Sequence, residues 1–303
     1  MILLSFVILF VGIGCSSSKN NEETSKEHKP VVAVSTFALY DISKFLAQDK
    51  IEIIHILPFG VDPHSFEPTP KLMAKIEKAD LVIYSGAGLE PWTHGFHFQH
   101  KAIDLSQYVA LRHLQKKGVV NHEEHHHNGI DPHYWLDFTN MKKMTHVIAQ
   151  AFIHLLPKEK SFFEANEKKY IQSLDELAQK YQEKLSTCKL NTVVISHNAL
   201  GYVADKYHFK VDSLTGLSPE SQPSAKDITR VMQDIKKEHV TTVFFEHFVN
   251  EAIVQSVARD SGIVLEVFQP LGNITADEAK QGLTYKDIMY KNLEKLSKAL
   301  ECK

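Results

Sequence analysis

The chain has 303 residues, of which 43% are hydrophobic and 23% are charged, and its formal net charge is -3. This length suits two lobes of roughly 130 residues each, and the balanced charge offers no basic surface for a nucleic acid, so we exclude nucleic-acid binding. Eighteen histidines against three cysteines direct any metal binding towards imidazole rather than thiolate ligands.

The first 14 residues predict an export signal. They form an apolar run that stops at Cys15, and a polar stretch then continues to residue 29. An apolar run of about 13 residues is too short to span a bilayer but fits the hydrophobic region of a secretory signal peptide. We therefore expect a signal peptide at 1–14, a flexible polar tether at 15–29, and a mature protein in the periplasm or at the cell surface.

Gly12-Ile13-Gly14-Cys15 resembles the lipobox of bacterial lipoproteins, in which the cysteine becomes the lipidated first residue. The chain departs from that pattern in two ways, because no Lys or Arg precedes the apolar run and Gly12 stands where Leu is usual. Lipidation of Cys15 would hold the body near a membrane without inserting it. The alternatives are ordinary signal cleavage and an uncleaved anchor with a misassigned start codon.

From residue 31 onward, strands and helices are expected to alternate. In the first half, strands are predicted at 31–35, 51–56, 80–84 and 102–105, and helices at 37–48, 70–79, 90–98 and 139–156. The polar stretch 106–130 is interpreted as a loop. A loop this long inside a compact domain is usually functional or disordered, and here we expect both.

One long helix is predicted over residues 158–186. Its apolar residues recur at helical spacing and form one face, at Tyr170, Leu174, Leu177, Tyr181 and Leu185. About 28 residues make a rod of roughly 42 Å, longer than a single lobe needs. We interpret it as a brace, which divides the chain into an N-terminal lobe at 30–157, a linking helix at 158–187 and a C-terminal lobe at 188–303.

The second half repeats the alternation. Strands are predicted at 191–196, 209–213, 241–245 and 263–267, and helices at 198–207, 224–238, 250–261 and 284–300. Such alternation implies an α/β fold in which each lobe has a parallel sheet flanked by helices. Ligands of parallel sheets bind outside the carboxyl ends of the strands, so a site is expected in the cleft between the lobes.

Three histidines, His64, His133 and His197, follow predicted strands, as do Glu246 and Gln269. The first two lie in Asp-Pro-His turns, in which the Asp-Pro pair is expected to aim the imidazole. The three histidines are 69 and 64 residues apart, unlike the His-x₃-His pair of zinc hydrolases, so only the tertiary fold can bring them together. Neutral imidazole is a preferred ligand of Zn²⁺, so a shared metal site is expected.

Cys188 and Cys302 are a candidate disulfide in an exported protein. One precedes a predicted strand and the other ends a predicted helix, so both positions fall at the same end of the sheet. Closing a loop of this size would contribute roughly 4 to 5 kcal/mol in the chain-entropy account. The alternative is two free thiols.

Five motifs, spread over nearly all of residues 30–300, occur in a specific order. They are Gly60-Val61-Asp62-Pro63-His64 with Glu67-Pro68, Asp131-Pro132-His133-Tyr134-Trp135-Leu136-Asp137, Ser196-His197-Asn198-Ala199-Leu200-Gly201-Tyr202, Phe244-Phe245-Glu246 and Pro270-Leu271-Gly272. In these motifs the chain resembles the substrate-binding proteins of bacterial zinc and manganese ABC importers. The resemblance implies two lobes joined by a rigid helix, with a metal held in the cleft by His64, His133 and His197.

Within that family, the residues favour Zn²⁺ over Mn²⁺. The manganese-binding members have Glu at the third ligand position, where this chain has His197, and imidazole-rich sets suit zinc whereas carboxylate-rich sets suit manganese. Many members have Asp as a fourth ligand where this chain has Gln269. The possible fourth ligands here are therefore Glu246, Gln269 or a water molecule.

A histidine-rich segment before His133 is also typical of the zinc-binding members. Its histidines are His122, His125, His126 and His127, and they predict an auxiliary metal loop that collects or senses zinc. The alternative is a loop that is merely solvated. His94, His97 and His100 are expected at the surface.

Through the resemblance, the sequence predicts a high-affinity, extracytoplasmic zinc-binding protein that delivers Zn²⁺ to the permease of an ABC importer. We expect a monomer that is not an enzyme and that touches the membrane only through a lipid anchor. The alternatives are a manganese-binding member of the same family, a zinc-dependent hydrolase with Glu246 as its base, and a surface adhesin whose metal is structural.

Overall fold

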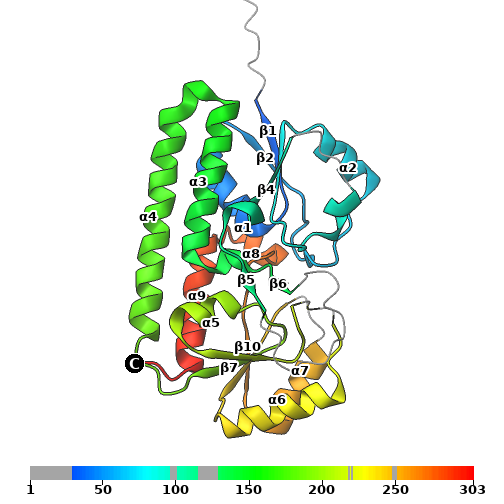
Figure 1. Ribbon diagram of the computed structural model, residues 1–303, viewed down its shortest axis with the longest axis vertical. Coiled ribbons are helices and arrows are strands. Elements are labelled where there is room, and N and C mark those ends of the chain that lie inside the picture. The colour runs from blue at the N-terminus through cyan, green and yellow to red at the C-terminus, as the bar shows by residue number, and fades with distance from the viewer. Residues whose placement is uncertain (1–28, 96–100, 115–128, 218, 220, 248–250) are drawn as a thin grey trace, which may run out of the picture.

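The structure is a computed structural model that describes residues 29–95, 101–114, 129–217, 219, 221–247 and 251–303. Within these residues the chain forms two α/β lobes, one above the other in Figure 1. Each lobe has a four-stranded parallel sheet flanked by helices, and the two sheets have the same topology. The predicted fold class is therefore confirmed.

The sheet of the first lobe has the order β2-β1-β3-β4, so its first strand is central. Val32 and Val34 face the main core on the side of the first helix, whereas Ala33 and Val82 pack on the opposite side, near the second helix. These elements are β1 (Val31–Val34), α1 (Phe37–Ala47), β2 (Glu52–His55), α2 (Pro70–Glu77), β3 (Leu81–Tyr84) and β4 (Ala102–Asp104).

In the second lobe the order is β10-β9-β7-β8, and its first strand is again internal. Val193 and Ile195 face the main core, and Val194 with Val243 packs on the outer side among residues of α6 and α7. The elements are β7 (Thr192–Ile195), α5 (Gly201–Tyr207), β8 (Lys210–Ser213), α6 (Ala225–Lys237), β9 (Thr242–Phe245), α7 (Glu251–Ser261), β10 (Val264–Val267) and α9 (Tyr285–Ala299).

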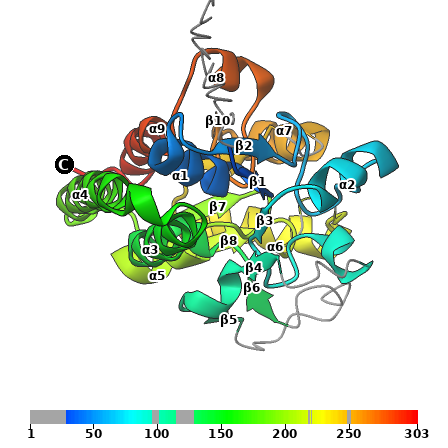
Figure 2. The same cartoon turned by 90° about the horizontal axis from the view of Figure 1, so that it is seen from above.

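The predicted long helix is α4 (Lys160–Leu185), which follows α3 (Phe138–Leu155) and a 3₁₀ turn, η4 (Pro157–Glu159). Its 26 residues run alongside both lobes at one edge of the molecule (Figures 1 and 2). It packs on α1 and α3 of the first lobe and on α5 and α9 of the second. The five apolar residues predicted for its inner face, Tyr170, Leu174, Leu177, Tyr181 and Leu185, are all buried.

One apolar core extends through both lobes. Its members include Val34 of β1, Leu177 of α4, Val193 of β7 and Leu296 of α9, all with no more than 1% of their surface exposed. Smaller clusters lie on the outer side of each sheet. The lobes are therefore continuous in their interior, and separating them would expose apolar surface to water.

Three stretches differ from the predicted elements. The helix expected at 90–98 is, in its described part, a 3₁₀ turn, η1 (Pro91–Gly95), because the Glu90 carboxylate turns back to accept from the backbone of Ser85 and Gly86. The stretch expected as a loop at 106–130, with its borders, holds four short elements: η2 (Leu105–Tyr108), the antiparallel pair of β5 (Arg112–His113) and β6 (Ile130–Asp131), and η3 (Tyr134–Leu136). The region after β10 holds a short helix that was not predicted, α8 (Ala276–Lys280).

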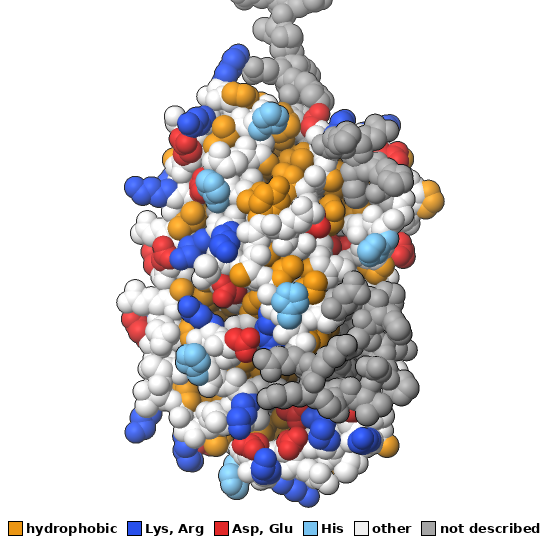
Figure 3. Space-filling view, in the orientation of Figure 1, with side chains coloured by type: hydrophobic (Ala, Val, Ile, Leu, Met, Phe, Trp, Pro, Cys, Tyr) orange, Lys and Arg blue, Asp and Glu red, His pale blue; other side chains and the backbone are white. Residues whose placement is uncertain are grey.

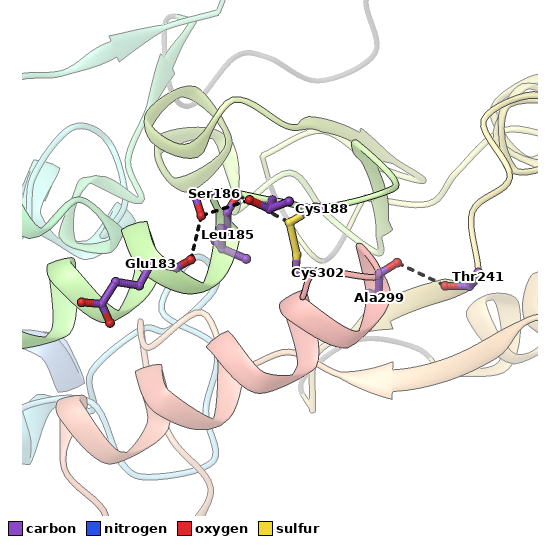
Figure 4. Close-up of a disulfide and its surroundings, with 8 residues drawn as sticks. Glu183, Leu185, Ser186, Cys188, Thr241, Ala299 and Cys302 are labelled. Atoms are coloured by element: carbon purple, nitrogen blue, oxygen red, sulfur yellow. Dashed lines mark hydrogen bonds between the residues drawn. A yellow bond between two sulfur atoms is a disulfide. The ribbon is translucent and has the colours of Figure 1, made fainter.

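Cys188 and Cys302 are joined by a disulfide bond, 114 residues apart in sequence. Figure 4 shows Cys188 just beyond the end of α4 and Cys302 just beyond α9. Backbone bonds flank the bridge, since the Leu190 N–H donates to Leu300 O at 3.0 Å. The chain terminus is thereby fastened to the segment that opens the second lobe.

Candidate metal centre

Three imidazoles carried by separate loops meet in a cavity between the lobes. His64 follows β2, His133 follows β6 and His197 follows β7, and one ring nitrogen of each lies within 4.8 Å of the others. The Nε2 atoms of His133 and His197 are 3.2 Å apart. Two nitrogens bound to one tetrahedral Zn²⁺ at 2.0–2.1 Å stand about 3.3 Å apart, so this separation suits a shared ion.

The first buried imidazole, His133, is oriented by the residue two positions before it. Asp131 Oδ1 accepts from the His133 backbone N–H at 3.0 Å and lies 2.9 Å from its Nδ1. Because burial raises the pKa of Asp131 only to about 6, its carboxylate is ionised at neutral pH and can only accept. The proton of neutral His133 is therefore on Nδ1, and the Nε2 lone pair points into the cavity.

His197 has an equivalent partner from the same lobe. Its Nδ1 pairs with Glu246 Oε1, and both side chains are almost fully buried. Burial lowers the pKa of His197, but the charges of Glu246, Asp62 and Asp131 outweigh it and raise this pKa above its ordinary value. The surroundings of the ring thus favour a positive charge at this point of the cavity.

The third imidazole, His64, lies on a loop that the second lobe holds in place. Asp62 Oδ1 accepts from the His64 backbone N–H at 3.3 Å, as an Asp-Pro-His turn predicts. The buried Asn273 amide donates to Pro58 O and Val61 O, both at 2.7 Å. The segment after β10 therefore fastens the loop that carries His64.

The cavity has a volume of about 10 Å³, the space of a single water-sized sphere. The wall of the cavity is closely packed at Gly272, because a Cβ added there would lie 3.1 Å from Pro63 Cγ and 3.4 Å from Trp135 Cζ2. Trp135 also donates from Nε1 to Pro270 O at 2.7 Å. The lining residues are Asp62, Pro63, His64, His133, Trp135, His197, Glu246, Pro270, Gly272 and Asn273.

The two protein side chains considered as a fourth ligand are placed differently. Glu246 lines the cavity, whereas Gln269 does not: its Nε2 donates to Glu278 Oε2 at 3.0 Å. Among the described residues, no group beyond the three histidines gathers enough His, Cys, Asp or Glu ligand atoms for a metal. His94 is exposed at η1, apart from the three.

Several predicted site residues lie outside the described part of the chain. These are Cys15, the auxiliary-loop residues His122, His125, His126 and His127, and the surface residues His97 and His100.

Two residues next to the site, Arg112 and Asn273, were not predicted. Asn273 directly follows the Pro270-Leu271-Gly272 motif, which is a signal that could have found it, whereas Arg112 stands in no recognisable motif.

Comparison with known proteins places the chain among metal-uptake components. A family model for ZnuA, described as zinc-uptake complex component A, periplasmic, matches residues 32–299. The high-affinity zinc uptake system protein ZnuA of Bacillus subtilis is 29% identical over 310 residues, which cover 99% of this chain and 96% of that protein.

A longer relative and its solved structure give the same picture. The zinc-binding lipoprotein AdcA of Streptococcus pneumoniae is 28% identical over 315 residues, and the match covers 99% of this chain but only 60% of AdcA. The crystal structure of its Zn(II)-bound ZnuA-like domain has a TM-score of 0.75 at 27% identity, covering 90% of this chain and 99% of that domain. The chain thus corresponds in length to this one domain.

Proposed function

The chain belongs to the ZnuA family of periplasmic zinc-uptake components, and from this premise we propose that it captures Zn²⁺ outside the cytoplasm and delivers it to an ABC-type importer. We propose His64, His133 and His197 as the ligands. The relatives named above as zinc-binding or zinc-uptake proteins support zinc as the cargo. An all-imidazole set also suits Zn²⁺ better than Mn²⁺.

The observation that carries this proposal is the pair of facing nitrogens at 3.2 Å. Asp131 and Glu246 each face the Nδ1 atom of one ring, so with both imidazoles neutral the two Nε2 lone pairs oppose each other in a buried space. Such lone pairs repel unless a proton or a metal cation lies between them, and zinc can take the place of that proton. A cation held there would convert this repulsion into two coordinate bonds.

For the fourth position we propose Glu246 or a water molecule. Glu246 lines the cavity beside His197, whereas Gln269 is not among the lining residues. A metal enclosed by three imidazoles and one oxygen is a common arrangement for zinc.

For the setting of the protein, we propose export through the signal at 1–14 and attachment by a lipid on Cys15. A polar tether at 15–29 would then hold a first lobe at 30–157, a linking helix at 158–187 and a second lobe at 188–303 near the importer. Among the described residues, no helix is both long and apolar enough to cross a membrane. On the face shown in Figure 3, acidic and basic side chains are interspersed.

A zinc titration of chelator-stripped protein tests the function. We expect a folded apo protein that binds one Zn²⁺ tightly and reversibly in the cleft, and His133→Ala should weaken this binding by orders of magnitude. His146→Ala is the matched control, because this exposed histidine pairs with Glu167 and neither residue lines the cavity.

Each alternative has its own outcome in the same experiment. Unfolding on removal of zinc would indicate a structural metal, and ester hydrolysis that requires zinc would indicate an enzyme. Tighter binding of Mn²⁺ than of Zn²⁺ would indicate the manganese-binding class. An unchanged dissociation constant for the His133 variant would remove that residue from the ligand set.

A further inference from the structure

A chain of charged groups leads from the surface to the metal centre. Arg112 of β5 lies between two carboxylates, because its Nε donates to Asp205 Oδ2 at 2.6 Å and its Nη1 donates to Asp131 Oδ2 at 3.4 Å. Asp205 is on α5 of the second lobe and its side chain is 65% exposed, whereas Asp131 is fully buried in the first. Arg112 therefore joins the two lobes.

The two oxygens of Asp131 have separate tasks. Oδ2 accepts from Arg112, and Oδ1 accepts from the backbone and faces Nδ1 of His133. The Arg112 guanidinium therefore helps to fix the rotation of the Asp131 carboxylate, which in turn orients the His133 imidazole. Without Arg112, the side-chain bonds that the described residues leave to this carboxylate are those to His133, the residue that it orients.

The surrounding backbone holds the same groups. The Arg112 N–H donates to Tyr202 Oη at 2.8 Å, and this hydroxyl donates to Asp131 O at 2.8 Å. At the start of α5, a Cβ on Gly201 would stand 2.5 Å from Arg112 Nη1 and 2.6 Å from Asp131 Oδ2. Only a residue without a side chain leaves space for this pair, so α5 packs directly against it.

We propose that Arg112 is a positioning residue for the zinc ligand His133, and that the Asp205–Arg112–Asp131 chain slows the release of zinc. This inference rests on the proposed zinc function. Partners that orient a metal-binding histidine typically change metal affinity 10- to 100-fold when they are lost. An ordinary exposed ion pair, in contrast, contributes little to stability and nothing to metal affinity.

The experiment compares Arg112→Met with wild type in the full chain, using Zn²⁺ alone as the probe. Competition with a chelator gives the dissociation constant, stopped-flow mixing with excess chelator gives the release rate, and urea unfolding gives the stability of the apo protein. We expect Arg112→Met to raise the dissociation constant about tenfold, mainly through faster release. Arg112→Lys should fall between, because it keeps the charge but loses the forked geometry.

Two comparisons isolate the route through Asp131. Lys142→Met removes a similar cation, which pairs with Asp175 between α3 and α4, and should leave the dissociation constant within twofold of wild type. In an Asp131→Asn background, Arg112→Met should have less than a twofold further effect, because the group through which it acts is already changed.

A dissociation constant for Arg112→Met within twofold of wild type would overturn the proposal, as would an undiminished tenfold effect in the Asp131→Asn background. Should Arg112→Met not fold, Asp205→Asn at the exposed end replaces it, with an expected threefold faster release and an unchanged rate as the contrary result. Equal zinc binding by wild type and His133→Ala would remove His133 from the ligand set, whereas a wild-type protein that does not bind zinc tightly and reversibly would refute the proposed function, so the two failures are distinguished.

Discussion

At the scale of the residue, the centre depends on which nitrogen of each imidazole carries the proton. Asp131 and Glu246 each face one Nδ1, so both Nε2 atoms are directed into the cavity. The third imidazole is fixed differently, through the backbone of its loop, which Asn273 holds from the opposite lobe. At the proposed zinc site, affinity would therefore depend on these supporting groups as well as on the three imidazoles.

Replacing Asn273 by Ala should separate loop positioning from stability. The change removes two donors to Pro58 O and Val61 O, and leaving those carbonyls without them should cost about 1 to 3 kcal/mol of unfolding free energy while also weakening zinc binding. Asn166→Ala is the control, because its buried amide donates from the linking helix α4 to Leu46 O of α1, and Asn166 does not line the cavity. Both variants should lose stability in urea, but only the first should bind zinc more weakly.

A partly buried imidazole outside the site should set part of the acid sensitivity of the fold. His55 lies between the rings of Tyr40 and Phe59, at 4.9 and 5.0 Å between centroids, and burial lowers its pKa to about 3. In the unfolded chain the His55 imidazole is protonated near pH 6.5, whereas in the folded protein it stays neutral. The folded protein therefore loses stability relative to the unfolded chain as the pH falls below 6.5. By pH 5 the loss should reach about 2 kcal/mol.

His55→Phe should abolish this loss while keeping an aromatic ring in the same packing. Urea unfolding at pH 7.5, 6 and 5 should show the variant gaining on wild type as the pH falls. The raised pKa values of Asp41 and Glu90, both about 6 because of burial, act in the opposite direction but equally in both proteins. Parallel pH profiles for the two proteins would show that His55 is not responsible.

At the scale of the element, long periodic stretches were predictable and short connections were not. The inner face of α4 could be identified from spacing alone, because each apolar residue recurs after one helical turn. β5 and β6 have two residues each and exist through pairing across a long stretch of sequence, which no local pattern encodes. α8 is similarly short, although the capping box between Thr275 and Glu278 was a local signal for it.

The same limit applies to the candidate site. His64 and His197 could be selected because each follows a strand of a parallel sheet whose carboxyl ends face the cleft, whereas His133 follows β6 of the antiparallel pair and was selected through its Asp-Pro-His motif. Arg112 could not, because its role comes from a contact with Asp205 of the opposite lobe, 93 residues away, whereas Asn273 could have been found from the Pro270-Leu271-Gly272 motif that it follows. Gln269 follows a strand as the ligands do, yet its side chain bonds to α8, the helix that was not predicted.

The pair of β5 and β6 permits a clean test of the histidine-rich segment between them. The Leu114 N–H donates to Gly129 O at 2.8 Å, so the two ends of the segment are held together by the backbone. Deleting residues 121–128 should lower the number of zinc ions bound but leave the tight site intact, as measured by metal content and competition titration. Replacing only His122, His125, His126 and His127 by Asn is the length-matched control, and equal stoichiometry in all forms would end the loop hypothesis.

At the scale of the whole molecule, the lobes are joined by packing as well as by the linking helix. The main core includes residues of both sheets and of α4. Asp41 of α1 accepts from Tyr170 Oη of α4 at 2.7 Å and from the Tyr285 N–H of α9 at 3.1 Å, so one carboxylate ties three helices. A hinge motion that separates the lobes would have to break both kinds of contact.

This continuity predicts one cooperative unfolding transition for the two lobes. Hydrogen exchange at increasing urea should give the same opening free energy for β1 and β3 as for β7 and β9, because the strands share one core. Zinc should raise both by the same amount, since its proposed ligands come from both lobes. Two separate transitions, or protection of only one sheet by zinc, would contradict this.

The shared interior has a further consequence for delivery to the proposed importer. If the lobes do not separate, the zinc-free and zinc-bound forms have nearly the same shape, so the importer has little basis for distinguishing them. The zinc-free form should then compete with the zinc-bound form for the importer. Uptake of labelled zinc should therefore slow when zinc-free protein is added in excess. An unchanged uptake rate would mean that the importer distinguishes the two forms.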